Sequence, residues 1–405
     1  MFLVATVSAG RAPVNAMRIA AVTFHVLNVN DRTNWSFVRV ELDGGAVGTG
    51  EASLNGYEPL LDACVQGLAA TLIGVEVEAS WRHLVTRPHA PGGLAQNAAK
   101  SAVAQALADA EARAAGVSLT RWLGGARRAR VPVYANINRA TVDRSPDGCA
   151  RSAQAAVAAG WPAVKIAPFD GVFPDALGRA ETQRAIDVGI ARVAAIRAAV
   201  GAGLGVMVDC HWRFDEPTAV AVLERLAPLC LGWFECPVSE QPTSHPALSR
   251  LRAAAHALNT RIAACELQSS VDGFRPFVAP ALDAAPLVDA IMPDVKYCGG
   301  PAEMLRIAAF AQAHSVAFSP HNPTGPVCTY ASLAVAACAD AVESLEVQLG
   351  ESDLLHEVVG GARPVLVDGC YEVPAGPGVG VALDDRVLAA HPYRPVPPFL
   401  DERLG

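Results

Sequence analysis

Three acidic side chains each end or directly follow a short apolar run in the middle of the chain: Asp209, Glu235 and Glu266. Their runs have the length and composition of buried strands. If these strands are neighbours in a parallel sheet, the three carboxylates converge at one end of it, and like charges that close require a cation. Oxygen-only ligands with room for water and substrate favour Mg²⁺, with Mn²⁺ as the alternative ion. The competing interpretation is three separate solvated acids on three loops, but the regular placement at strand ends favours a metal site.

A histidine and an aspartate follow two later apolar runs. His321 lies in Phe-Ser-Pro-His-Asn-Pro at 318–323, and Asp294 ends Ile-Met-Pro-Asp at 291–294. On adjacent strands the two side chains would touch, and an aspartate bonded to one imidazole nitrogen leaves the other nitrogen free to take a proton. A histidine alone is more often a polar loop residue. The paired placement predicts a general base, and metal binding of a substrate carboxylate would then stabilise the enolate that forms.

The elements that must position these side chains form a repeating pattern from residue 131 onward. Short apolar runs alternate with helix-length segments, which is typical of βα units. The expected strands are 131–135, 163–167, 205–210, 232–236, 262–265, 290–292, 316–319 and 344–347. Eight such units predict an α/β fold of the (β/α)7-8 TIM-type barrel class, whose active site lies at the carboxyl ends of the strands.

The part of the chain before the barrel has a different pattern. Residues 17–52 alternate like strands with turns, and helical segments follow, so an α+β capping domain is predicted over residues 17–130. The barrel is expected over residues 131–355, and the C-terminal segment 356–405 is expected to return and complete the cap. Residues 1–16 precede the first strand pattern and are interpreted as an extension or a mis-assigned start, in either case without chemistry.

Composition argues against several classes of protein. The chain has 405 residues, a formal charge of -8 and no long run of lysine or arginine, which argues against nucleic acid as a partner. No apolar stretch reaches the roughly 18 residues that span a bilayer, so no membrane partner is expected and the protein is expected in the cytoplasm. The 10 cysteines form no C-x-x-C pair or regular framework and are interpreted as buried small hydrophobes.

The motifs and their order resemble the enolase superfamily, specifically its mandelate racemase and sugar-acid dehydratase branch. The likeness covers nearly the whole chain after Met17, and it rests on the order of short motifs rather than on any one of them. These motifs are Val-Lys-Ile-Ala at 164–167, Val-Asp-Cys-His-Trp at 208–212, Phe-Glu-Cys-Pro at 234–237, Cys-Glu at 265–266, Pro-Asp at 293–294, Pro-His-Asn-Pro-Thr-Gly-Pro at 320–326, Leu-Glu-Val-Gln at 345–348 and Pro-Gly-Val-Gly-Val-Ala-Leu at 377–383.

The resemblance implies a role for several of these positions. It implies that the acidic triad binds Mg²⁺ and that the His321–Asp294 pair is the base. Glu346 is implied as a hydrogen-bonding or acid group near the substrate carboxylate. A homo-oligomer in which a cap closes each barrel is implied as well.

The chain departs from the branch at the second barrel strand. Racemases of this branch have a Lys-x-Lys pair there, whereas this chain has Lys165 followed by Ala167. Residues two apart in a strand point the same way, so one face of the substrate lacks its base, which argues against simple 1,1-proton transfer. Lys165 is interpreted as a catalytic contact to the substrate carboxylate or an electrostatic stabiliser. The alternative is a lysine that pairs with a nearby metal ligand.

A second departure favours a particular reaction. Asp-Cys-His at 209–211 places His211 on the same face as Asp209 by the two-residue strand period, where many relatives have asparagine. In sugar-acid dehydratases resembling galactonate dehydratase, a histidine at this place protonates the departing 3-hydroxyl. The hypothesis is that His321 takes the α-proton and His211 helps to expel water, giving a 2-keto-3-deoxy acid. Alternatively, His211 only holds a carboxylate ligand.

The partner is expected to be a small carboxylate substrate, an aldonic or aldaric acid. Cap loops would contact its distal end through Arg32, Asn34 and Tyr57. Asn136 and Asn138, after the first barrel strand, are further candidates for hydroxyl contacts. Each of these residues fits equally well as an ordinary loop residue.

Three functions remain open. The favoured one is a Mg²⁺-dependent lyase, an acid-sugar dehydratase. A racemase, epimerase or cycloisomerase of a related carboxylate would exchange the α-proton with solvent without forming a keto acid. A sugar-acid-binding protein with a relic metal site would bind metal and acid without exchange, and the intact His321–Asp294 pair argues against it.

Overall fold

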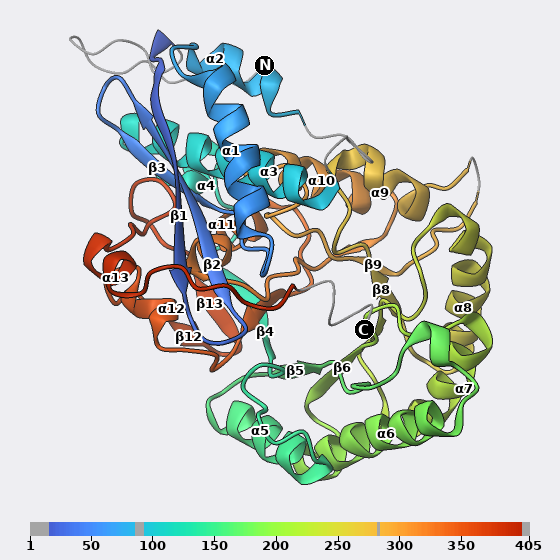
Figure 1. The fold of residues 1–405 in the computed structure, drawn as a ribbon. Helices are drawn as coiled ribbons and strands as arrows, with labels where there is room; N and C mark the ends of the chain where they lie inside the picture. The colour runs from blue at the N-terminus through green and yellow to red at the C-terminus, as the bar shows by residue number, and fades with distance from the viewer. Residues whose placement is uncertain (1–15, 86–92, 282–283, 399–405) are drawn as a thin grey trace.

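The computed structural model describes residues 16–85, 93–281 and 284–398, and two bodies of secondary structure meet in it (Figure 1). An antiparallel sheet with helices comes first along the chain, and parallel strands with outer helices follow. The predicted extension at residues 1–16 lies outside the described residues except for its last position.

The N-terminal sheet has three antiparallel strands in the order β1-β2-β3, and its central strand faces two cores. Trp35 and Phe37 of β2 pack into the barrel core, whereas Val38 and Val40 pack against the cap helices. Because successive side chains of a strand point to opposite faces, β2 joins the cap to the barrel. The elements of the cap are β1 (Ile19–Asn28), β2 (Asn34–Leu42), β3 (Val47–Glu51), α1 (Glu58–Leu72), α2 (Val77–Ser80), α3 (Gly93–Ala114) and α4 (Leu119–Trp122).

Helix α3 packs on strand β3 with almost no side chain between the two backbones. A Cβ atom added at Gly48 would lie 2.0 Å from the carbonyl oxygen of Ala106, and one added at Gly50 would lie 2.0 Å from the carbonyl oxygen of Ala102. Small residues are therefore needed on both elements, since larger side chains would force the backbones apart. This contact explains why an alanine-rich helix packs on a Gly-Thr-Gly strand.

Eight parallel strands form the second body. From β4 to β10 each strand pairs with the next along the chain, and β11 returns to pair with β4. Two backbone hydrogen bonds span the remaining gap: the N–H of Glu343 donates to Phe318, and the N–H of Glu346 donates to Pro320. The predicted fold class, a barrel of βα units with an α+β cap, is confirmed. The strands are β4 (Arg130–Asn136), β5 (Ala163–Ile166), β6 (Gly205–Asp209), β7 (Phe234–Glu235), β8 (Ile262–Ala264), β9 (Ala290–Ile291), β10 (Ala317–Phe318) and β11 (Leu345–Gln348).

Helices follow the strands on the outside, and Figure 1 shows α5 to α8 around the outer side of β5 and β6. Two of them begin at a side-chain cap, because Ser145 and Asp215 accept the N–H groups of Gly148 and Thr218. Within the described residues, no helix is both long and apolar enough to cross a membrane. The barrel helices are α5 (Pro146–Ala158), α6 (Ala180–Val200), α7 (Glu216–Leu226), α8 (His245–Ala257), α9 (Ser270–Val278), α10 (Pro301–Ala313) and α11 (Pro326–Cys338).

Strands β5 to β10 are shorter than their apolar runs predict. Strand β7 ends at Glu235 because Cys236 takes φ 43, and β8 ends at Ala264 because Cys265 takes φ 80. A positive φ lies outside the β region, so it breaks the strand whatever the residue's hydrophobicity. The turns fall directly beside Glu235 and Glu266, and they shape the barrel mouth.

The C-terminal segment contacts both bodies. Strand β13 pairs antiparallel with β4 of the barrel. Further along, Asp385 forms an ion pair of 2.6 Å with Arg39, and the carbonyl of Arg394 accepts a hydrogen bond of 2.8 Å from Asn34 of the cap. The segment thus reaches the cap as predicted and also extends the barrel sheet; the domain limits at 130 and 355 stay a prediction. Its elements are α12 (Leu354–Glu357), β12 (Leu366–Val367), β13 (Cys370–Glu372) and α13 (Asp385–Ala390).

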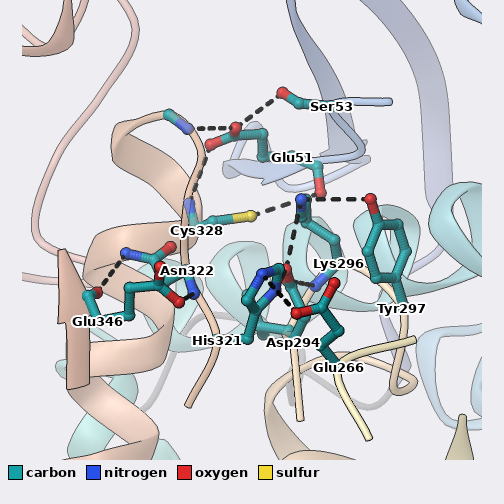
Figure 2. A network of polar contacts seen from close by, with 12 residues as sticks. Glu51, Ser53, Glu266, Asp294, Lys296, Tyr297, His321, Asn322, Cys328 and Glu346 are labelled. Carbon is teal, nitrogen blue, oxygen red and sulfur yellow. Dashed lines mark hydrogen bonds and ion pairs between the residues drawn. The ribbon is translucent and has the colours of Figure 1, made fainter. Parts of the chain in front are cut away.

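Glu51, the last residue of β3, connects the cap to a barrel helix (Figure 2). Its carboxylate accepts the N–H groups of Gly325 at 2.8 Å and Cys328 at 3.0 Å, at the N-terminus of α11. Ser53 donates a third hydrogen bond of 2.7 Å. A helix N-terminus favours an acceptor with negative charge, so a cap residue supplies the acceptor that a barrel helix needs.

Substitution at Gly50 tests the packing of β3 on α3. We expect Gly50→Ala to lower the free energy of unfolding by about 1–3 kcal/mol, because the added methyl group overlaps the backbone of Ala102. The control is Gly67→Ala in α1, where a Cβ meets nothing within 4 Å and the exchange should stabilise the helix by about 0.5–1 kcal/mol. Urea unfolding followed by circular dichroism measures both, and equal effects of the two variants would contradict the packing argument.

Candidate active site

The three carboxylates predicted to bind a metal meet at the mouth of the barrel. Asp209 ends β6, Glu235 ends β7, and Glu266 follows β8. One oxygen from each lies within 4.8 Å of the others, and all three side chains are buried. Parallel strands that end side by side bring these carboxylates together, as the sequence predicts.

Burial makes this arrangement electrostatically costly. It raises the pKa of Glu235 well above its usual range; Lys165 opposes this shift, and the charges of Asp209 and Glu346 add to it. Burial also raises the pKa of Asp209, but the charge and the hydrogen bonds of His211 lower it by more, so that the net shift is downward. Three clustered oxygens are the donor set that hard divalent cations prefer. The residues of the triad therefore fit Mg²⁺ or Mn²⁺.

Lys165 is fully buried and bridges two acids. Its Nζ lies 2.6 Å from Oε1 of Glu235 and 3.1 Å from Oε1 of Glu346. Burial lowers the pKa of Lys165, but the two carboxylates outweigh it and raise the pKa well above its usual range. The amine therefore stays protonated and serves as a fixed positive charge. The sequence left open whether this lysine contacts substrate or pairs with a metal ligand, and in the structure its Nζ contacts Glu235, one of the three predicted ligands.

His321 and Asp294 form the predicted pair (Figure 2). Nδ1 of His321 lies 2.8 Å from Oδ2 of Asp294, and Nε2 lies 3.3 Å from Oε2 of Glu266. Burial lowers the pKa of His321, but the charges of Glu266, Glu346 and Asp294 raise it above its ordinary value. The Asp294 contact orients the ring, so Nε2 points toward the carboxylate triad. A base nitrogen beside a metal-binding cluster is the arrangement needed for proton abstraction next to a bound carboxylate.

Glu346 lies in β11, the strand that pairs with β4, and three contacts hold its carboxylate. Oε1 accepts a hydrogen bond of 2.6 Å from Asn136, and Oε2 accepts one of 3.1 Å from the N–H of Asn322. With Lys165 on the same carboxylate, these contacts fix its orientation. Asn136 thus acts on Glu346, whereas the sequence predicted a contact to substrate.

His211 reaches the site by a different route from the one the sequence predicts. Strand β6 ends at Asp209, and His211 has φ 49, so the two-residue strand period does not extend to it. The turn instead brings its ring back, and Nε2 lies 2.8 Å from Oδ2 of Asp209. Its side chain stays 26% exposed, which leaves part of the ring accessible from the barrel mouth.

The candidates for the distal end of the substrate fall in different places. Asn34 lines a cavity between cap and barrel, although its amide already donates to Glu58 and Arg394. Arg32 is exposed, and Tyr57 packs partly against the cap core at the start of α1. Asn138 accepts the N–H of Ala167 at 2.6 Å and so holds its loop to β5. Only Asn34 of this group is among the residues that line the cavity.

Two residues near the site were missed from the sequence, the buried Lys296 and the partly buried Glu240. Lys296 lies 3.3 Å from Oδ2 of Asp294 and lines the same cavity as His321. Glu240 accepts hydrogen bonds from the indole of Trp212 and the N–H of Cys265, and thereby ties together the loops that carry His211 and Glu266. One signal could have singled out Lys296: the chain has three lysines, and two of them, Lys165 and Lys296, lie in or shortly after a barrel strand.

Comparison with known proteins places both bodies in one family. Residues 148–387 match the model of the enolase C-terminal domain-like family. Residues 11–124 match the N-terminal domain of mandelate racemase / muconate lactonizing enzyme. The two matches cover the barrel and the cap in the order observed here.

Individual relatives agree with this assignment. The chain is similar to a D-galactonate dehydratase of Ralstonia nicotianae, with 31% identity over 366 residues that cover 87% of this chain and 90% of the relative. It is 30% identical to a D-galactonate dehydratase of Xanthomonas axonopodis pv. citri over 363 residues, which are 87% of this chain and 90% of that protein. A solved mandelate racemase/muconate lactonizing enzyme-like protein from Rubrobacter xylanophilus superposes with a TM-score of 0.81 at 30% identity, covering 95% of this chain and 100% of that one. The chain therefore belongs to the mandelate racemase and muconate lactonizing enzyme family of enolase-like enzymes.

Proposed function

We propose that this protein is a Mg²⁺-dependent lyase that removes water from an acid sugar to give a 2-keto-3-deoxy acid. The observation that carries the proposal is the position of Nε2 of His321, 3.3 Å from the metal-binding carboxylate of Glu266 and backed by Asp294. The D-galactonate dehydratases that the chain resembles support the reaction class. A base next to a carboxylate-binding cluster is suited to take a proton from the carbon beside a substrate carboxylate.

Several residues of the chain contribute to the first step, abstraction of the α-proton. His321 accepts the α-proton at Nε2, and Asp294 holds Nδ1 so that the ring keeps its orientation. Lys165 and Glu346 stand beside the triad as a fixed cation and a fixed acceptor near the substrate carboxylate. Bound Mg²⁺ supplies positive charge where the substrate carboxylate gains negative charge.

Departure of the 3-hydroxyl needs a proton donor on the other side of the site. His211 fits this role because its ring borders Asp209 and remains partly exposed at the barrel mouth. It would give its proton to the leaving hydroxyl, which departs as water while the electron pair of the α-carbanion forms the C2–C3 double bond. The resulting enol becomes the 2-keto group by tautomerisation.

An isomerase of a related carboxylate is the second candidate, because one of the matching family models bears the name of a racemase. A 1,1-proton transfer needs an acid or base on each face of the substrate. Ala167 has no ionisable side chain, and the protonated Lys165 is held by two carboxylates. These features favour dehydration over racemisation.

His321→Asn tests the base. We expect the rate of α-proton exchange with D₂O, and the rate of keto-acid formation, to fall by about 10²–10⁴-fold because the amide cannot take the proton.

His211→Asn should keep exchange but lose keto-acid formation, since only water loss needs its proton. His314→Asn, at an exposed position at the end of α10, is the control and should change neither rate. NMR of the substrate α-position and a semicarbazide assay report the two steps, and full exchange in His321→Asn would refute this assignment.

Metal binding can be tested without turnover. Mg²⁺ at 100 times its Kd should stabilise the EDTA-treated protein by about 2.7 kcal/mol, seen as a rise in Tm. Glu235→Gln should abolish the Mg²⁺ response, because a neutral amide replaces one of the three charged oxygen ligands. Glu41→Gln, at an exposed position of β2, should respond like the unmodified protein. An unchanged Mg²⁺ response in Glu235→Gln would place the metal elsewhere.

A further inference from the structure

A narrow cavity lies where the cap meets the barrel beside His321, and its wall is rich in hydrogen-bond donors. Lys296 and Arg139 are among the lining residues, and no aspartate or glutamate lies among those that the structure describes there. The lining residues are Thr33, Asn34, Trp35, Ser53, Leu54, Asn55, Arg139, Lys296, Tyr297, His321, Pro323 and Thr324. A wall with cations and without carboxylates is complementary to an anion.

The two cations of the wall differ in how well they are paired. Arg139 donates two hydrogen bonds of 2.9 and 2.7 Å to the carboxylate of Glu351. Lys296 is 2% exposed, yet the polar contacts of its Nζ among the described residues are long, 3.3 Å to Asp294 and 3.3 Å to the hydroxyl of Tyr297 (Figure 2). The same Oδ2 of Asp294 already contacts His321 at 2.8 Å. A buried ammonium group that shares its counter-ion with the base has capacity for a further acceptor.

The cap supplies an independent observation on another residue that lines the cavity. Trp35 is 1% exposed, and its Nε1 has no hydrogen-bond acceptor within the part of the chain that the structure describes. An indole nitrogen can only donate, so it calls for an acceptor from outside the chain. Buried polar groups without a partner are uncommon in native proteins, and one that lines a ligand cavity points to a ligand atom.

We propose that Lys296 and Trp35 together bind a second anionic group of the substrate, which makes the substrate a dicarboxylic sugar acid of the aldaric class. This inference rests on the proposed function, because it assumes that the first carboxylate lies at the metal triad. Lys296 supplies the charge and Trp35 the orienting N–H. A distal carboxylate satisfies both, whereas the terminal hydroxyl of an aldonic acid offers no compensating charge.

Galactarate and galactonate form a matched pair of probes, because they share the arrangement at C2–C5 and differ only at C6. Binding to the Mg²⁺-loaded full chain is measured by calorimetry in the His321→Asn background, where turnover is blocked. We expect galactarate to bind at least about 10-fold more tightly than galactonate, as one charged contact implies. A broader panel of aldaric and aldonic acids, matched in the same way, covers other configurations.

Two substitutions and a control separate the contacts. Lys296→Met should weaken the binding of the diacid by about 10-fold or more and the binding of the monoacid by less than about 3-fold. Trp35→Phe keeps the ring, removes the N–H and should show a smaller loss confined to the diacid. Lys100→Met, which removes the remaining lysine of the chain from α3, should change neither affinity. The Mg²⁺-induced rise in Tm shows that each variant is folded.

The outcomes distinguish this inference from the proposed function. Aldonic acids that bind and exchange their α-proton as well as their aldaric partners would overturn the inference and leave the dehydratase proposal standing. Equal losses for both acids in Lys296→Met would also overturn it, since that pattern assigns Lys296 to holding Asp294 alone. If no sugar acid binds to the Mg²⁺-loaded protein, the proposed function fails and the inference fails with it.

Discussion

Mutual repulsion among buried carboxylates is the constraint on which the site depends. Five acids surround the barrel mouth: Asp209, Glu235, Glu266, Asp294 and Glu346, each buried. Two lysines, Lys165 and Lys296, lie among them, and they leave an excess of three negative charges. A divalent cation and one protonated imidazole would bring the cluster to neutrality. The proposed metal and the raised pKa of His321 therefore fit one electrostatic balance.

The cap matters because the barrel does not complete the site alone. Trp35 and Phe37 of strand β2 pack in the barrel core, whereas Val38 and Val40 of the same strand pack in the core of the cap. The same strand places Trp35 in the wall of the cavity that Lys296 also lines. At the cavity edge, Thr33 of the cap donates a hydrogen bond of 2.6 Å to Glu351, which also binds Arg139 after β4. Cap and barrel therefore meet through polar contacts at the edge of this cavity.

Much of the fold and the core of the site were predictable because they follow local patterns. Apolar runs of strand length mark the eight strands, and a polar residue at the end of each run marks the mouth. The triad and the His321–Asp294 pair follow from that pattern, and the structure brings their side chains together. The positive φ of Cys236 and Cys265 was not predictable, since neither cysteine has a local preference for that conformation.

The parts that the sequence missed depend on contacts between distant segments. Lys296 lies two residues beyond Asp294, after β9, and it lines a cavity together with residues of the cap. The position of His211 depends on a turn with positive φ, not on the strand period. Trp35 has the pattern of any core residue of a strand, and only the cavity distinguishes its indole nitrogen.

The hydrogen bonds of Glu51 bear on how such chains can be divided. Two matches describe the cap and the barrel as separate segments, yet the N–H groups of Gly325 and Cys328 at the N-terminus of α11 donate to a carboxylate from the cap. A fragment that begins at β4 would contain every predicted metal ligand and both members of the base pair. It would still leave the N-terminus of one of its helices without an acceptor. The boundary between the two matched segments is therefore not a boundary between independent folding units. In a chimaera with the cap of another protein, the N-terminus of α11 finds an acceptor only if the new cap has an acid at the position of Glu51.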